Sequence, residues 1–337
     1  MTVDETFSLG NFELQSGTVL PDAFLGYATY GTLNDARNNV IVYPTWWSGH
    51  HGDAEPYIGA GKALDPARYF IIVPDMFTNG LSTSPSNCAP PFDGMNFPLV
   101  TTRDNIEAQY RLLTEQFGIS GVELAMGFSM SGQQAYHWGA LYPDFVKRIC
   151  CICGSAKTSP HNWLYLNSYI TAMESAEGWS DGTCKTWPSK LLTTMASIGA
   201  TMAWSQDWYR EGKHLEAGAS TPAEFVTAVK GIFERWVPAD LYAQTLSWMA
   251  ADVSANEKFN GDLDAALGAI KARALIMPCD TDIYFRVADN EAEVSKMPNA
   301  ELKVIRSSWG HMAGLPGASP ADDAFVDMAL QELLRSE

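Results

Sequence analysis

The stretch VELAMGFSMSGQQ, residues 122–134, decides how this sequence is interpreted. Its first half is apolar and typical of a strand, and its second half starts a helical pattern that ends at Pro143. A serine between a strand and a helix, with small residues around it, is typical of a nucleophile elbow. Ser129 is the predicted nucleophile because Gly127 lies two residues before it. Ser131 stands where the G-x-S-x-G motif has its second glycine, so the motif is not complete.

A nucleophilic serine needs a histidine base, which a carboxylate orients. Of six histidines, His311 follows the last predicted strand in a loop near the C-terminus. The strand before it, residues 274–277, leads into Asp280 and Asp282, at the sheet edge where sites in open α/β sheets gather. The order serine, aspartate, histidine is that of α/β hydrolases. We predict a Ser129–Asp282–His311 triad and keep Asp280 as the alternative acid.

The oxyanion formed during acyl transfer needs two backbone N–H donors. The first is predicted to be Met130, directly after the nucleophile. The second should come from the loop after the strand at 40–43, where either Trp46 or Trp47 can donate. His50, with the histidine that follows it, lies in the same loop and is a candidate for lining the pocket.

In the rest of the sequence, short apolar runs alternate with helical patterns. Such runs suit strands buried on both faces of a parallel sheet, and their alternation with helices predicts an α/β fold. A capping box at Thr101–Asp104 and the pair Ser319-Pro320 mark two helix starts. The predicted sheet strands are residues 40–43, 69–73, 122–126, 149–152, 274–277 and 302–305, and an N-terminal hairpin covers 7–14 and 19–30.

An inserted helical segment is predicted between the serine and the acid. From residue 129 to residue 282 is 153 positions, whereas two strand–helix steps need only about 60–70. The excess matches a stretch that holds seven of the eleven tryptophans and no convincing buried strand. We predict an α/β core formed by residues 1–155 and 262–337, with a helical cap at 156–261 whose helices cover 189–204, 221–235 and 239–251.

Composition excludes several classes of protein. The 337 residues are 46% hydrophobic, which fits a globular chain, and 22 basic against 39 acidic residues give a net charge of −17. Neither nucleic acid nor an anionic membrane is therefore expected as a partner. No signal peptide is visible, and the six cysteines do not indicate a disulfide framework, so a cytoplasmic protein is expected. No nucleotide-binding or metal-binding motif is found, and neither a cofactor nor a metal is predicted.

Seven segments occur in a recognisable order: residues 26–34, 57–65, 68–70, 97–98, 101–104, 127–130 and 310–311. Together they resemble the homoserine O-acetyltransferase family of α/β hydrolases. The resemblance implies a mostly parallel sheet flanked by helices, and it implies a homodimer that pairs through the cap helices. It also implies that Ser129, Asp282 and His311 form the triad, with oxyanion N–H groups from Trp47 and Met130.

The departures from that family concern the substrate. Its acetyltransferases usually have an aspartate after the histidine, but here Met312 follows. A pocket lined by Trp46, His50 and Met312 favours an apolar group over a zwitterion. The sequence thus resembles esterase-like members, and we predict hydrolysis of a small-molecule ester with a short acyl group, acetyl above all, on an apolar alcohol. The alternatives are an acyl-CoA-dependent O-acyltransferase, a C–C bond hydrolase and a non-catalytic binding protein.

Overall fold

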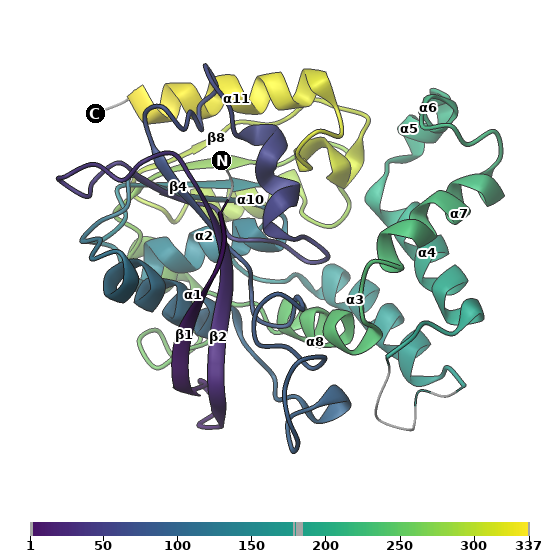
Figure 1. Ribbon diagram of the computed structural model, residues 1–337. Coiled ribbons are helices and arrows are strands. Elements are labelled where there is room, and N and C mark those ends of the chain that lie inside the picture. The colour runs from purple at the N-terminus through teal and green to yellow at the C-terminus, as the bar shows by residue number, and fades with distance from the viewer. Residues whose placement is uncertain (1–2, 178, 180–184, 336–337) are drawn as a thin grey trace.

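The computed structural model describes residues 3–177, 179 and 185–335, and these form an eight-stranded sheet with helices on both faces (Figure 1). The strand order is β1-β2-β4-β3-β5-β6-β7-β8. The first two strands form an antiparallel hairpin, β2 is antiparallel to β4, and every later pairing is parallel. The predicted α/β fold is confirmed. The strands are β1 (Val3–Glu13), β2 (Val19–Tyr30), β3 (Val40–Val42), β4 (Phe70–Pro74), β5 (Leu124–Phe128), β6 (Arg148–Ile152), β7 (Arg273–Met277) and β8 (Ala300–Leu302).

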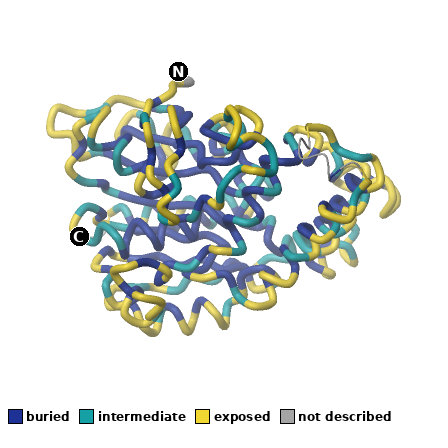
Figure 2. The backbone as a smooth tube through the Cα atoms, turned by 90° about the horizontal axis from the view of Figure 1, so that it is seen from below, coloured by how far each residue is buried: buried dark blue, intermediate teal, exposed yellow. Residues whose placement is uncertain are grey.

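The central strands are buried on both faces, as their apolar runs predict (Figure 2). In β3, Ile41 packs in one core cluster while Val40 and Val42 pack in the other. The last strand differs from its prediction of 302–305, because β8 begins at Ala300 and regular pairing ends at Leu302. Beyond it the chain still bonds to β7 through single contacts, with the residue at 305 forming an isolated bridge to Cys279.

The helices that cover the two faces of the sheet come from different parts of the chain. One core cluster includes residues of α1, α2 and α9, and the other includes residues of α11 and the inserted helices. The predicted capping box at the start of α1 is present. None of the described helices has the length and apolar character needed to cross a membrane. The bounds are α1 (Thr102–Arg111), α2 (Met130–Leu141), α9 (Leu263–Gly268), α10 (Val287–Val294) and α11 (Pro320–Arg335), with shorter helical turns η1 (His51–Tyr57), η2 (Gly94–Asn96), η3 (Leu112–Gln116) and η5 (Gly310–Gly314).

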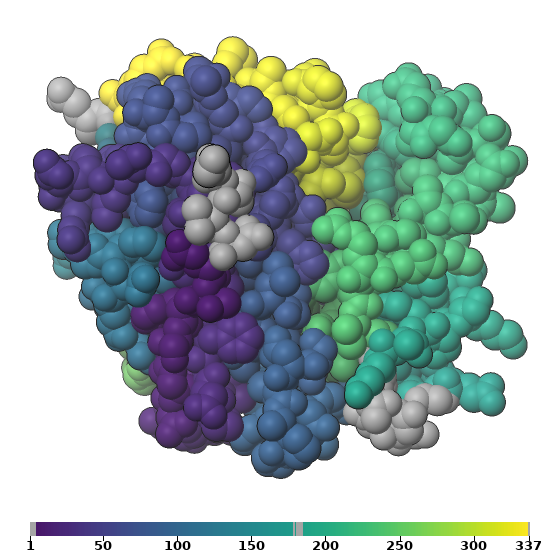
Figure 3. All heavy atoms as spheres, in the orientation of Figure 1, coloured from purple at the N-terminus to yellow at the C-terminus, as the bar shows by residue number. Residues whose placement is uncertain are grey.

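Between β6 and α9 the chain forms a separate group of helices beside the sheet (Figure 1), and this stretch makes up the right-hand side of the molecule in the space-filling view (Figure 3). Helices α3 and α8 pack on each other and lie nearer the sheet, and α4 packs on α7 farther out. The predicted helices in this stretch are present, whereas α3 had not been predicted. The α-helices described in this stretch are α3 (Pro160–Glu174), α4 (Ser189–Ala203), α5 (Gln206–Arg210), α6 (Lys213–Glu216), α7 (Pro222–Phe233) and α8 (Pro238–Met249).

Contacts at two places join the outgoing and returning segments of this inserted stretch. Lys157 and Asp252 form an isolated antiparallel bridge, and their side chains form an ion pair of 2.7 Å. Farther out, the indole N–H of Trp187 donates to the carbonyl of Trp236 at 2.9 Å. The helices α4–α7 therefore begin and end at nearly the same place.

Candidate active site

Ser129 lies at the sharp turn between β5 and α2, with φ 57° and ψ −126°. A residue other than glycine is strained in this conformation and keeps it only if its surroundings enforce it. The turn is tight because Gly127 has no side chain: a Cβ there would lie 2.0 Å from the hydroxyl oxygen of Ser131 and 2.3 Å from its carbonyl carbon. The strand and helix thus approach closely enough to place the serine at the tip of the turn, where it lines the cavity described below.

Ser131, the departure from the motif, has a defined partner. Its buried hydroxyl donates to the carbonyl of Pro44, in the loop after β3, at 2.5 Å. The hydroxyl therefore ties the start of α2 to the loop in which the second oxyanion donor was predicted. No pattern in the sequence pointed to this bond, because it joins segments 87 residues apart.

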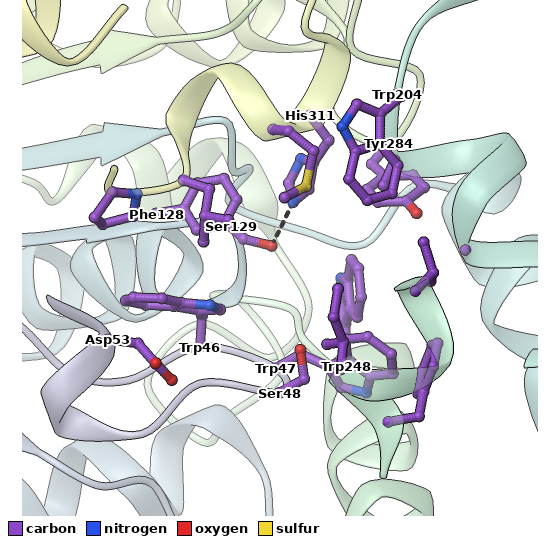
Figure 4. A pocket seen from close by; sticks show the side chains of 18 of the residues that line it. Trp46, Trp47, Ser48, Asp53, Phe128, Ser129, Trp204, Trp248, Tyr284 and His311 are labelled. Atoms are coloured by element: carbon purple, nitrogen blue, oxygen red, sulfur yellow. Dashed lines mark hydrogen bonds between the residues drawn. The ribbon is translucent and has the colours of Figure 1, made fainter. Parts of the chain in front are cut away.

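The structure brings Ser129, Asp282 and His311 together from three different strand ends (Figure 4). His311 Nε2 lies 2.9 Å from Ser129 Oγ, and His311 Nδ1 lies 2.8 Å from Asp282 Oδ2. The other carboxylate oxygen, Oδ1, accepts the backbone N–H of Tyr284 at 2.7 Å and of Phe285 at 3.3 Å. This chain of hydrogen bonds fixes the imidazole between a carboxylate and a hydroxyl, as transfer of the serine proton requires.

Asp280, the alternative acid, faces a different group. Its Oδ1 accepts the backbone N–H of Ser307 at 3.1 Å, and its Oδ2 lies 3.3 Å from the guanidinium of Arg306. Of the two aspartates, only Asp282 contacts the imidazole of His311 in the described hydrogen bonds.

The loop after β3 makes a tight turn beside Ser129. The N–H of Gly49 donates to the carbonyl of Trp46, and Ser48 has a φ of 61°, which gives a type II turn. The Ser48 N–H is already bonded to the side chain of Gln244. None of the described hydrogen bonds uses the backbone N–H of Trp47 or Met130, so these two groups are free to face a substrate oxygen.

A cavity of about 380 Å³ opens at Ser129 between the sheet and the inserted helices. Figure 4 shows Ser129 and His311 pointing toward each other at the cavity, with the indoles of Trp46 and Trp47 beside them. Most of the lining is aromatic or aliphatic, which suits an uncharged, apolar ligand. Its charged lining residues, Asp53 and Arg235, pair with each other at 3.2 Å.

The three predicted substrate-binding residues do not all reach this cavity. Trp46 and Met312 line it. His50 is not among the described lining residues, because its ring packs on Trp236 with centroids 4.2 Å apart and its Nε2 lies 3.2 Å from the carbonyl of Asn79. This environment explains why burial lowers the pKa of His50, and it corrects the prediction that this side chain lines the pocket.

Residues 40–318 match the family described as the alpha/beta hydrolase fold. The chain belongs to the α/β-hydrolase family. This α/β hydrolase is 37% identical over 98% of its length to the ethyl acetate hydrolase of Pseudomonas veronii, of which it covers 95%.

Two further relatives place the α/β hydrolase within the family. The solved structure of an acetylester hydrolase from Corynebacterium glutamicum matches with a TM-score of 0.94 and 35% identity, covering 99% of this chain and 96% of that one. The homoserine O-acetyltransferase of Thermobifida fusca is 27% identical, covering 88% of this chain and 86% of that protein. The predicted resemblance to esterase-like members of the acetyltransferase-like group is confirmed.

Sequence reasoning missed most of the residues by which the inserted helices of this α/β hydrolase line the cavity. The tryptophan-rich composition of the segment was noticed, but it did not indicate which rings face the serine. That depends on how α3, α4, α7 and α8 pack on one another beside the sheet. The missed lining residues include Tyr165, Tyr169, Trp204, Phe233 and Trp248, together with Tyr284 from the loop after β7.

Two of these tyrosines pair beside the triad. The Tyr284 hydroxyl donates to that of Tyr165 at 2.9 Å, and the Tyr284 ring lies 4.6 Å from the imidazole of His311, centroid to centroid. Burial raises the pKa of both phenols well above the usual value, so they remain neutral. Among the described residues of the α/β hydrolase, no group of three His, Cys, Asp or Glu side chains is arranged to hold a metal.

Proposed function

We propose that this α/β hydrolase is a carboxylic ester hydrolase that cleaves esters of short acids, acetate above all, with apolar alcohols. The observation that carries the proposal is the hydrogen-bonded series Ser129–His311–Asp282 at the floor of an apolar cavity. Relatives named for ethyl acetate and acetyl esters, similar over nearly the whole chain, support the same reaction and acyl group.

The first half of the reaction acylates the enzyme. Ser129 Oγ attacks the ester carbonyl carbon and gives its proton to His311 Nε2, while Asp282 holds the imidazole in orientation and stabilises its positive charge. The carbonyl oxygen becomes an oxyanion, which the backbone N–H groups of Trp47 and Met130 stabilise. When the intermediate collapses, the bond to the alcohol oxygen breaks, and His311 donates its proton to that oxygen.

The second half releases the acid. Water gives a proton to His311 and attacks the acyl carbon, and collapse of the second intermediate returns the proton to Ser129. Water rather than an amino-acid alcohol is the acceptor because Met312, an apolar residue, lines the cavity next to the histidine. An apolar side chain at this position provides no partner for the ammonium group of such an acceptor.

Replacement of the nucleophile tests the proposal. We expect Ser129→Ala to hydrolyse p-nitrophenyl acetate at least about 10³-fold more slowly than the parent, since the triad acts as a unit. Unchanged thermal unfolding would show that the variant is folded. A parent-like rate in Ser129→Ala, or no labelling of Ser129 by a fluorophosphonate, would refute the proposal.

Substrate range and acceptor are tested separately. For a series of p-nitrophenyl esters from acetate to octanoate, we expect kcat/KM to be highest for the shortest acyl groups. Acetyl-CoA should release little free thiol whether or not an apolar alcohol is present. Thiol release that depends on the alcohol would instead establish acyl transfer.

We also propose that the protein is cytoplasmic and forms a homodimer through the inserted helices. The resemblance to acetyltransferases that pair in this way supports the dimer. Light scattering on the purified protein would give its mass directly, and a mass of about one chain at micromolar concentration would reject the dimer.

A further inference from the structure

Helix α8 contacts the turn beside the nucleophile through two consecutive buried side chains. Gln244 Oε1 accepts the backbone N–H of Ser48 at 2.9 Å, and the Thr245 hydroxyl accepts the indole N–H of Trp47 at 3.0 Å. The two contacts span 196 and 198 residues of sequence, from the inserted segment back to the loop after β3. The turn at Trp47 is therefore held by a helix that belongs to a different part of the chain.

This turn needs to be held. In a type II turn the third residue has a positive φ, which glycine adopts readily and other residues do not. Here that residue is Ser48, with a φ of 61°. Its N–H belongs to the central peptide of the turn, between Trp47 and Ser48, and the bond to Gln244 fixes the direction of that peptide.

The other end of the same amide fixes a second strained loop. Gln244 Nε2 donates to the carbonyl of Thr78, in the loop after β4, at 3.0 Å, and Thr78 also has a positive φ, 73°. One side chain thus accepts from one loop and donates to another. An ionised glutamate cannot donate, and a methionine of similar size can form neither bond at comparable strength.

We infer that Gln244 is a positioning residue for the oxyanion hole. This role rests on the proposed function: the Gln244 amide holds the Trp47–Ser48 peptide, which fixes the turn and with it the preceding Trp46–Trp47 peptide, whose N–H faces the developing oxyanion. The same bond withdraws the Ser48 N–H from that role. The Trp47 ring is fixed as well, since it stacks on Tyr169 at 5.6 Å and lies 5.9 Å from Trp248.

The test replaces the amide and keeps its size. Loss of one oxyanion donor costs about 10²–10³-fold in kcat, so a displaced donor in Gln244→Met should cost roughly 10–100-fold, with KM changed less than about 3-fold. Affinity for an alkyl trifluoromethyl ketone, which forms a tetrahedral adduct with the serine, should fall by a similar factor. Affinity for the matching alcohol, which forms no adduct, should stay within about 2-fold, because it does not use the oxyanion hole.

Two further variants separate positioning from stability. Gln244→Glu keeps an oxygen that can accept the Ser48 N–H, and it should recover part of the kcat lost in Gln244→Met. Ser247→Ala is the matched control on the same helix, because its hydroxyl bonds to the carbonyl of Val100 at 2.6 Å, away from the cavity. It should lower thermal stability but leave kcat and ketone affinity unchanged.

The outcomes are distinct. If Gln244→Met keeps the parent kcat and ketone affinity, or if Ser247→Ala loses both to the same extent, the positioning role is rejected while ester hydrolysis stands. If Gln244→Met does not fold, Gln244→Asn tests the same bond by withdrawing the amide by one methylene. A parent protein that neither hydrolyses acetate esters nor labels at Ser129 would reject the proposed function itself.

Discussion

At the scale of single residues, two aspartates separated by one residue have different partners. Asp282 receives two backbone N–H groups and faces the imidazole of His311, and it is buried. Asp280 is partly exposed and lies beside a guanidinium at the surface of the loop. The sequence could name both as candidates from their position after a strand. The sequence alone could not show by physical reasoning which of them is the triad acid, because this depends on how the loop after β7 folds back.

Matched substitutions at these two positions give the first prediction. Asp282→Asn should lower kcat for p-nitrophenyl acetate by about 10³–10⁴-fold, because an asparagine neither stabilises the imidazolium nor fixes its tautomer. Asp280→Asn should change kcat less than about 3-fold. Steady-state kinetics on both variants test this prediction. Equal losses of kcat would contradict the assignment of Asp282 as the residue that orients His311.

The second prediction concerns Ser131, whose hydroxyl bonds to the carbonyl of Pro44. In Ser131→Ala this buried carbonyl loses a partner, so the free energy of unfolding should fall by about 1–2 kcal/mol. Ser197→Ala is a suitable control, because its hydroxyl also bonds to a carbonyl but is exposed, and it should cost less than about 0.5 kcal/mol. Urea unfolding measures both, and no difference between them would contradict the assigned bond.

At the scale of elements, α10 anchors the point where the chain leaves the sheet for the inserted helices. Glu293 accepts the backbone N–H of Ala156, the hydroxyl of Tyr136 on α2 and the side-chain amide of Asn290, each at 2.8 Å. Burial raises the pKa of Glu293 from 4.5 to about 7, although the three hydrogen bonds act in the opposite direction. One carboxyl group therefore links a crossover helix, α10 and the start of the insertion.

A third prediction follows from this pKa. Because the folded protein binds the Glu293 proton more tightly than the unfolded chain, the group contributes stability below pH 4.5, and this contribution is lost as pH rises to about 7. A shift of this size corresponds to about 3 kcal/mol. The free energy of unfolding of the parent and of Glu293→Gln is measured at several pH values. The difference between the two proteins should change by about 3 kcal/mol between pH 4.5 and about 7. A difference that is constant with pH would disprove the assignment.

Patterns local to the sequence predicted the elements well but not their contacts. The apolar runs located the strands, and the capping box located α1, because burial and capping act on neighbouring residues. The role inferred for Gln244 had no signal, since a glutamine on a buried helix face looks like any other polar residue until the facing loop is known. His50 was placed wrongly for the same reason, because the indole that covers it is 186 residues away.

At the scale of the whole molecule, the net charge of −17 acts on every ligand that approaches the cavity. The charged groups that line the cavity, Asp53 and Arg235, pair with each other and leave the general negative field in place. An anionic substrate should therefore be repelled at low ionic strength, and a neutral ester should not. The same field disfavours acetyl-CoA as an acyl donor.

The fourth prediction compares 4-acetoxybenzoate, an anion, with its neutral methyl ester. Raising the salt from about 0.01 M to about 0.15 M shortens the Debye length from about 30 Å to about 8 Å. Over this range, kcat/KM should rise at least about 3-fold for the anion, because screening weakens the repulsion. The neutral ester should change little and serves as the control. Equal responses would show that the global charge does not reach the site.

The bond between Trp187 and the carbonyl of Trp236 has an evolutionary consequence. Because α4–α7 start and finish at one junction, a change of length within that stretch does not require α3 and α8 to move apart. Evolutionary selection for new ester substrates can thus change the wall of the cavity that α4–α7 form, separately from the rest of the site. The nucleophile, its base and the turn at Trp47 would stay unchanged. Enzymes descended from one ancestor can therefore accept different esters while they keep the same catalytic mechanism.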